Sequence, residues 1–411
     1  MPPEPAFFAG RSAVVEHPAV AGHSAVRARR ILVAASCLAV ALCLGEAKLG
    51  DTAVYWQAGR RVLAGGDVYG FTVNHFGFTY PPFAAMVIGA VSWLPEAGLW
   101  CLFNLLSLLA LVTVLRLCAA ADIAAARRGD TRAALRLSSL VLALPVTETF
   151  RFGQVDLILL ALVLVDLLVY RRGILLGVAA AFKLTPGLFV VYLLMQRRYR
   201  EAAVATGVFL GAGALSSTVL PHAAATYWLH DLESGTGIGG FDGARNQSLH
   251  GVALRAFGAH LGPVVWVALA LPVLLLGMLL ARRIARAGLE LLAIGAVGVT
   301  GCLISPLSWN HHWVWAVPAL AALYSAVPAA RRRFRQWLAV VSSVLVAWTV
   351  LPPCAQTWQP LHVVGAGLVP LALVTAALGA ATHRSGLRSG RAPGRASGRG
   401  ETLATRPVSA A

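Results

Sequence analysis

The carboxylate of Asp51 stands shortly past the first strongly apolar run of the chain, which covers about residues 31–45. A carboxylate at the mouth of a membrane domain can act as a general base on a hydroxyl group that arrives from the water phase. The same aspartate could instead accept hydrogen bonds from the first backbone N–H groups of a following helix. The chemical interpretation therefore depends on which other groups lie on the same side of the membrane.

Basic side chains in unusual positions could supply the other half of such a site. Lys183 is one of only two lysines and interrupts an apolar run beside Pro186, where an unpaired charge is costly. His311 and His312 stand at the mouth of another apolar run, and Arg245 lies in a long loop. Lysine, arginine and histidine together favour an anionic phosphate. The plainer alternatives are an ion pair for Lys183, although no carboxylate is obvious nearby in sequence, and an interfacial position for the histidines.

Six short polar clusters separate the apolar runs. They cover residues 51–55, 78–83, 151–156, 183–186, 245–248 and 305–313. The candidate substrate-binding residues in them are Tyr55, Tyr80, Gln154, Asp156, Asn246, Gln247 and Trp309. Asp156 also begins an apolar run and could simply cap a helix. Our topology puts all six clusters on the outer side, so we expect them to form one pocket.

One carboxylate with several cations suits sugar transfer from a lipid phosphate better than glycoside hydrolysis. The departing phosphate needs stabilisation by cations, not protonation by a second carboxylic acid. A glycosidase, in contrast, uses a pair of carboxylates. The low acidic content, 17 Asp and Glu in 411 residues, agrees with transfer.

Composition indicates a polytopic membrane protein. Hydrophobic residues make up 58% of the chain and charged residues 12%, which does not fit a soluble globular domain. The net charge of +17 comes from arginines in short loops and in the tail, a distribution that sets membrane topology and does not indicate nucleic-acid binding. Some of these arginines could also contact anionic membrane lipids. The six cysteines show no CxxC spacing, so we expect neither a disulfide framework nor a zinc site.

The arginine loops predict an all-α fold with about twelve membrane crossings. The expected crossings are at about 29–46, 97–118, 134–150, 156–170, a short pair within 174–196, 203–220, 258–281, 288–304, 313–328, 336–351 and 363–381. Arginines flank both ends of 174–196, so the chain must turn back near Lys183. Non-helical backbone at such depth is tolerated only inside protein or in a water-filled cavity. Asp166 is an exception, since it lies in an apolar run with no partner in sequence.

The same pattern divides the chain into an arm, a membrane domain and a tail. The expected parts are a disordered cytoplasmic arm at 1–28, the transmembrane domain at 29–382, and a disordered, arginine-rich cytoplasmic tail at 383–411. Within the domain, 47–96 is the expected catalytic outer loop and 221–256 a second large outer loop. The first loop carries two short juxtamembrane helices, at 51–63 and 83–94. The second of these is too short to cross a core of about 30 Å.

At these motifs the sequence resembles glycosyltransferase family 87, of the GT-C class. Within that family it is most similar to the actinobacterial polyprenol-phosphate-mannose-dependent α-1,2-mannosyltransferases that elongate phosphatidylinositol mannosides. The matching residues are Asp51 with Val54-Tyr55, FTYPPFAA at 78–85, Phe152-Gly153-Gln154, KLTP at 183–186, Asn246-Gln247-Ser248 and SPLSWNHHWVW at 305–315. FTYPPF and SPLSWNHHWVW are long and specific, whereas KLTP and NQS are short but occur in the expected order.

The resemblance implies an inverting transfer on the extracytoplasmic side of the cell membrane. The donor would be a polyprenyl-phosphate-linked sugar, expected to be β-mannose, and the product an α-mannoside of a glycolipid or lipoglycan acceptor. Asp51 aligns with the base, while Lys183, His311 and His312 would contact the lipid phosphate with Arg245 beside them. Asp156 is the candidate for an acidic residue that GT-C enzymes often carry in the second outer loop. Many GT-C enzymes use a divalent metal, but no convincing ligand set is visible, so we expect no metal and no other cofactor.

Rival functions remain open at this point. An arabinofuranosyltransferase that uses decaprenyl-phosphate arabinose would share these motifs, because they do not show the identity of the donor sugar. A transporter or flippase of lipids or sugars would distribute ionisable groups along a path through the bilayer, whereas here they gather on one face, with Asp166 as the exception. A non-catalytic scaffold is the third option.

Overall fold

The computed structural model describes residues 18–44, 50–231, 241–243 and 246–326. These residues form helices joined by turns and loops, with one isolated β-bridge between Val73 and Phe76. The predicted all-α class is therefore confirmed for the described part of the chain. The expected crossings at 336–351 and 363–381, the tail and most of the N-terminal arm lie outside it, so the count of twelve stays a prediction.

The helices follow one another in this order: α1 (Pro18–Leu44), α2 (Gly50–Leu63), α3 (Pro82–Gly89), α4 (Glu96–Cys118), α5 (Ala120–Arg127), α6 (Thr131–Val141), α7 (Leu144–Phe152), α8 (Asp156–Val165), the π-helix η1 (Asp166–Tyr170), α9 (Ile174–Phe182), the 3₁₀-helix η2 (Thr185–Gly187), α10 (Leu188–Met195), α11 (Tyr199–Val219), α12 (Pro221–Thr226), the π-helix η3 (Tyr227–Asp231), α14 (Leu249–Arg286), α15 (Glu290–Ile304), the 3₁₀-helix η4 (Asn310–Trp315) and α16 (Ala316–Ala326).

Three of the described helices, α4, α11 and α14, are long and apolar enough to cross a membrane. Helices α6 and α7 add a fourth if the pair, bent by 46°, is counted as one span. These helices overlap the crossings predicted at 97–118, 203–220, 258–281 and 134–150. Leucines such as Leu109 on α4 and Leu276 on α14 are 56% and 67% exposed. Large exposed apolar faces of this kind are typical of membrane contact.

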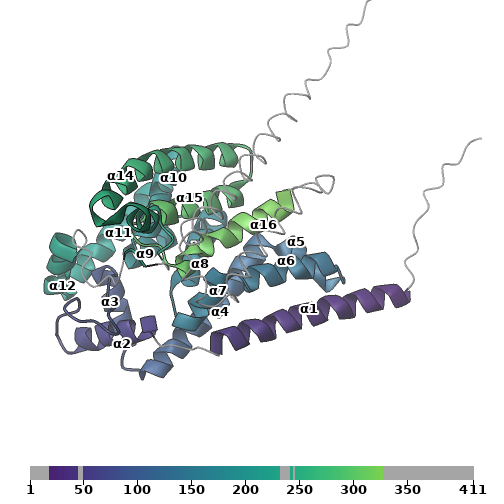
Figure 1. Cartoon of the computed structure of the whole chain (residues 1–411), viewed down its shortest axis with the longest axis horizontal. Coiled ribbons are helices and arrows are strands. Elements are labelled where there is room, and N and C mark those ends of the chain that lie inside the picture. Colours follow the sequence, from purple (N-terminus) through teal and green to yellow (C-terminus); the bar gives the residue numbers. More distant parts are fainter. Residues whose placement is uncertain (1–17, 45–49, 232–240, 244–245, 327–411) are drawn as a thin grey trace, which may run out of the picture.

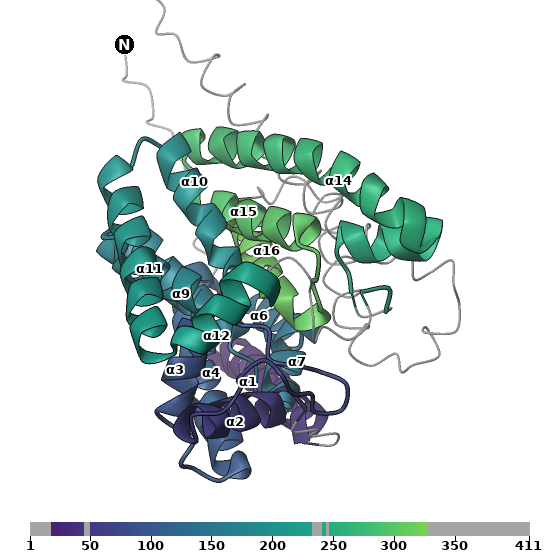
Figure 2. The ribbon, with the colours of Figure 1, turned by 90° about the vertical axis from the view of Figure 1, so that its left-hand side faces the viewer.

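The helices form two groups with the middle of the chain between them. In Figure 1, α1 runs along the lower edge, where it packs against α5, α6 and α7. At the opposite edge α14 covers α15. Figure 2 shows α2 and α3 together at the lower end, with α3 also against α11. Helix η4 packs against α7, α8 and α15, so the histidine segment lies where the two groups meet.

The chain reverses direction at Lys183. Helix α9 ends there because Lys183 takes an extended backbone, with φ −147° and ψ 130°. At the start of α9, a Cβ on Gly173 would collide with the backbone of Glu201 in the first turn of α11. Helix α10 ends just before the first turn of α11. Both ends of 174–195 therefore lie together, which agrees with the up-and-down pair that the flanking arginines predicted.

The two short helices of the first outer loop are also present. Helix α2, at Gly50–Leu63, closely matches the predicted 51–63, and Gly65, two residues past its end, has a φ of 66°, the left-handed conformation that glycine adopts readily. Helix α3 begins at Pro82, since proline fixes φ for a first helical turn. It ends at Gly89, earlier than the predicted 94, so it is clearly too short to cross a membrane.

Asp166 has a structural role that the sequence did not reveal. Its carboxylate accepts hydrogen bonds from the backbone N–H groups of Arg172 at 3.0 Å, Gly173 at 2.9 Å and Leu176 at 2.9 Å. It therefore satisfies N–H groups at the start of α9 that the helix itself leaves without acceptors. The residue is 1% exposed, so it belongs to the packing of the helices and not to a path through the bilayer.

Candidate active site

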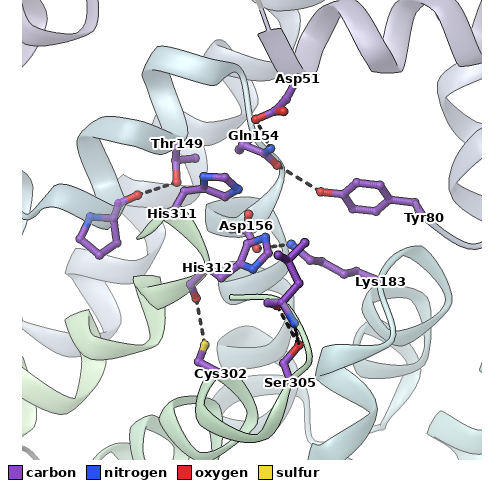
Figure 3. A network of polar contacts seen from close by, with 12 residues as sticks. Asp51, Tyr80, Thr149, Gln154, Asp156, Lys183, Cys302, Ser305, His311 and His312 are labelled. Carbon is purple, nitrogen blue, oxygen red and sulfur yellow. Dashed lines mark hydrogen bonds and ion pairs between the residues drawn. The ribbon is translucent and has the colours of Figure 1, made fainter. Parts of the chain in front are cut away.

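Five of the six polar clusters meet at one cavity of about 630 Å³. The expectation of a shared pocket is thus confirmed for these five. The polar and aromatic lining residues are Asp51, Tyr55, Phe76, Thr79, Tyr80, Gln154, Lys183, Thr185, Tyr227, Ser305, Trp309 and His312. A volume of this size suits a ligand as large as a sugar phosphate with part of a lipid chain. Asp51 and Lys183 face this space from two different helical segments (Figure 3).

Asp51 is held by a direct contact with Gln154. The side-chain amide Nε2 of Gln154 donates to Asp51 Oδ2 at 2.6 Å (Figure 3). Burial raises the pKa of the Asp51 carboxyl above its ordinary value, while His311, the Gln154 hydrogen bond and Lys183 act in the opposite direction. A carboxylate with a raised pKa is a stronger proton acceptor, as a general base requires.

Close packing between α2 and the end of α7 brings these two residues together. Thr52 Oγ1, one residue after the base, donates to the carbonyl of Phe152 at 3.0 Å. The next residue, Gly153, has φ of 64°, and a Cβ there would overlap the Thr52 hydroxyl. Only glycine therefore allows the turn that carries Gln154 from α7 toward Asp51.

Lys183 and Asp156 form an ion pair, with 2.8 Å between Lys183 Nζ and Asp156 Oδ1. The ammonium also lies 5.3 Å from the centre of the Tyr80 ring, a cation–π distance. The sequence showed no obvious carboxylate near Lys183, and the structure identifies Asp156 as its ion-pair partner. Asp156 is 5% exposed and does not line the main cavity, so its predicted role in substrate binding stays a prediction. Lys183 does line the cavity and has further N–H donors for a ligand.

The two neighbouring histidines occupy different positions. His312 lines the cavity, whereas His311 is 2% exposed and is absent from its lining. Nδ1 of His311 lies 3.9 Å from Glu148 Oε2, and neither of its ring nitrogens has a hydrogen-bond partner among the described residues. Of the two predicted phosphate-binding histidines, the structure thus places His312 at the cavity and His311 behind it, against Phe152, and their contact with phosphate stays a prediction.

The Asn246 cluster supports the site from behind. Asn246 is fully buried, its Nδ2 donates to Pro306 O at 3.0 Å, and its Oδ1 accepts from Ser308 N at 2.9 Å. The Gln247 backbone N–H adds a bond of 2.8 Å to Ser308 O. These contacts fix the loop that carries Trp309. Asn246 and Gln247 do not line the cavity, so their predicted contact with substrate stays a prediction, and Arg245 lies outside the described residues.

Asp156, His311 and His312 form a group whose ligand atoms lie within 4.8 Å of one another and could hold a metal ion. Three buried atoms of this group, Asp156 Oδ2 and both ring nitrogens of His311, lack hydrogen-bond partners in the described part of the chain. The ammonium of Lys183 already pairs with Asp156 and would repel a cation at this point. Lys183 and His312 line the cavity and can instead donate N–H groups to a phosphate oxygen, so the expectation of a metal-free site stays our prediction.

The sequence-based prediction missed several residues of the site, among them Phe76, which lines the cavity, Glu148 and Tyr227. Glu148 is buried beside His311 and accepts a hydrogen bond from Asn310 Nδ2 at 3.3 Å. Tyr227 reaches the cavity from the end of α12 and packs against Tyr69. A glutamate within a mostly apolar stretch of sequence is a signal that could have identified Glu148. No comparable signal marks Tyr227.

Comparison with known proteins gives a consistent result. The family model of glycosyltransferase family 87 matches residues 78–306. A polyprenol-phosphate-mannose-dependent alpha-(1-2)-phosphatidylinositol mannoside mannosyltransferase of Mycobacterium tuberculosis (strain ATCC 25618 / H37Rv) is 31% identical over 74% of this chain and 77% of its own length. A polyprenol-phosphate-mannose-dependent alpha-(1-2)-phosphatidylinositol pentamannoside mannosyltransferase of Mycobacterium tuberculosis (strain CDC 1551 / Oshkosh) is 33% identical over 75% of this chain and 74% of its own length.

Among solved structures, ArnT from Cupriavidus metallidurans bound to undecaprenyl phosphate aligns with 86% of this chain and 77% of its own, at 17% identity and a TM-score of 0.39. The family assignment does not depend on this alignment, because the family model alone matches residues 78–306. With more than half of its length matched by that model, the chain belongs to glycosyltransferase family 87.

Proposed function

We propose that the protein transfers mannose from a polyprenyl-phosphate-mannose donor to a glycolipid or lipoglycan acceptor, with inversion, to give an α-mannoside of the α-1,2 type. The observation that carries the proposal is the single cavity into which Asp51, Lys183 and His312 all point. Family membership and relatives named for the same donor class support the choice of substrate.

Asp51 is the base in this mechanism. Its carboxylate accepts the proton of the acceptor hydroxyl, whose oxygen attacks the anomeric carbon as the bond from that carbon to the phosphate oxygen breaks. Gln154 occupies Oδ2, which leaves Oδ1 for the acceptor. Displacement from the opposite face converts a β-linked sugar into an α-linked product, and Asp51 then returns its proton to water.

The Lys183 ammonium and an N–H donor on His312 stabilise the leaving group. The donor phosphate is a diester with one negative charge, and it departs as a monoester with a second charge. Lys183 faces the cavity beside Tyr80, and His312 lines the same space. Positive charge and N–H donors placed where negative charge develops lower the barrier most effectively in a site sheltered from water.

Apolar residues give the lipid part of the donor a route out of the cavity. Leu188 and Val191 on α10 and Ile304 on α15 complete the lining near Lys183. Val191 is also 45% exposed at the surface of the helix bundle. A polyprenyl chain along this wall would keep its phosphate at Lys183 while its tail remains among lipids.

The distribution of arginines along the chain supports an extracytoplasmic active site in the cell membrane. Lys183 forms the tip of the segment 174–195, and both ends of that segment carry arginines, at 171–172 and 197–198. Arginine-rich loops are cytoplasmic in most membrane proteins, so the tip and the cavity face the other side.

Purified protein in liposomes, with synthetic polyprenyl-phosphate-mannose and a phosphatidylinositol mannoside acceptor, tests the proposal. We expect a mannosylated product by mass spectrometry and none from Asp51→Asn protein that elutes as a single species. Normal transfer by Asp51→Asn would refute the role of the base. Transfer only from decaprenyl-phosphate arabinose, or movement of labelled lipid without transfer, would favour the rival functions.

A further inference from the structure

Gln154 connects the carboxylate of Asp51 to two buried phenols. Its Nε2 donates to Asp51 Oδ2 at 2.6 Å, and its Oε1 accepts from Tyr55 OH at 2.6 Å and faces Tyr80 OH at 3.1 Å. The two phenol oxygens are themselves 2.7 Å apart. Gln154 is 2% exposed, Tyr55 1% and Tyr80 9%, so protein supplies almost all contacts of this group.

Counting protons determines which way the amide faces. Each phenol carries one proton, so Tyr55 and Tyr80 together supply two for the three short contacts among their oxygens and Gln154 Oε1. In every allowed arrangement Oε1 accepts at least one of them. A reversed amide would place Oε1 against the carboxylate oxygen of Asp51, two acceptors without a proton between them. The tyrosines therefore ensure that an N–H group faces Asp51.

The backbone of Gln154 is equally fixed. Its N–H donates to Thr149 O at 2.8 Å, and its carbonyl accepts from Ser107 Oγ at 3.2 Å. A residue held at both backbone groups and at both ends of its amide cannot follow a moving ligand. This rigidity suits a group that orients a base more than one that binds a sugar.

We propose that Gln154 is a positioning residue: with Tyr55 and Tyr80 it fixes the Asp51 carboxylate, occupies Oδ2 and directs Oδ1 at the acceptor hydroxyl. This inference rests on the proposed function, because it assumes that Asp51 is the base. It replaces the assignment of these three residues to substrate contact alone.

The same hydrogen bond favours the ionised form of the base. The ionisable groups near Asp51 are His311, Lys183 and Asp156; the first two lower the pKa of Asp51 and the third raises it. Burial favours the neutral acid. Removal of the Gln154 N–H donor therefore raises the pH below which Asp51 is protonated, while the other groups stay in place.

The test compares Gln154→Met with Gln57→Met, a glutamine on α2 that does not line the cavity. For Gln154→Met we expect kcat to fall roughly 10- to 100-fold, part of the gain that a placed base provides. The acid limb of the kcat profile should move up by about one pH unit, with the donor KM nearly unchanged. Gln57→Met should match the wild type.

A second variant keeps the inference testable if Gln154→Met does not fold. In the double variant Tyr55→Phe/Tyr80→Phe, Gln154 Oε1 loses both phenol donors. We expect the acid limb of the kcat profile to move to higher pH, by less than in Gln154→Met. An unshifted limb in both variants, or a rise in donor KM with unchanged kcat, would overturn the inference. If Asp51→Asn is inactive in the same assays, such a result leaves the proposed function intact; if Asp51→Asn is active, the proposed function itself fails.

Discussion

The ammonium of Lys183 lies 2.8 Å from the carboxylate of Asp156, a residue 27 positions away at the start of another helix. The side chains are 14% and 7% exposed, so the pair is largely removed from water. The pair holds a cation inside an apolar fold. It also means that the donor phosphate meets an ammonium whose charge is partly balanced before the ligand binds.

Lys183→Met should reduce both stability and transfer. The variant leaves Asp156 buried without its cation, which costs about 3–5 kcal/mol. Adding Asp156→Asn should recover most of that loss, because no buried charge then remains. Thermal melting of the detergent-solubilised proteins measures both effects.

Transfer should stay low in the double variant, by a factor on the order of 100, because the phosphate still lacks its cation. This contrast separates the two roles of Lys183. Recovery of transfer together with stability would mean that the lysine only compensates Asp156.

The rate should fall on the acid side at a higher pH than an exposed aspartate would give. Burial raises the pKa of Asp51 above its ordinary value of 3.8, and the protonated acid cannot accept the acceptor proton. Activity is thus complete above the raised pKa and is lost as the pH falls through it. A pH profile of kcat/KM measures the midpoint, and melting at each pH shows whether the fold persists. A midpoint below 3.8 would contradict the burial argument.

Gly153→Ala should impair transfer severely. Left-handed backbone costs an alanine roughly 1–2 kcal/mol, and the new methyl group would overlap the hydroxyl of Thr52, which adjoins the base. Gly207→Ala in α11 is the matched control, since a Cβ there meets nothing within 4 Å. Equal activity of the two variants would show that the α2–α7 contact does not position Asp51.

Removal of divalent metal should leave transfer unchanged. The candidate ligands Asp156, His311 and His312 stand beside the Lys183 ammonium, which disfavours a cation there. We expect equal rates before and after dialysis against EDTA. A loss of activity that added Mn²⁺ or Mg²⁺ restores would assign the group to a metal instead.

The sequence predicted those parts of the fold that follow from local patterns. The amphipathic repeat gave α2, Pro82 marked the start of α3, and arginines on both sides of 174–196 required the reversal at Lys183. Roles that depend on distant contacts were not predictable in this way. Asp156 and Asp166 differ only in what packs against them, an ammonium in one case and the first turn of α9 in the other.

The same limit applies to the polar motifs. His311 and His312 are neighbours in sequence, but the tight turn of η4 points one ring into the interior and the other into the cavity. Asn246 looked like a ligand contact because it is polar and close to Arg245. Its burial against the 305–309 loop became evident only from the tertiary structure.

The reversal at Lys183 makes the depth of the ammonium depend on the bilayer. Helices α9 and α10 are each too short to cross a hydrocarbon core of about 30 Å, and the ends they share carry arginines that stay at the headgroups. Changes in acyl-chain length would therefore shift this side chain relative to the aspartate on the surface helix α2. We therefore expect the turnover rate to depend on the lipid thickness of the host membrane.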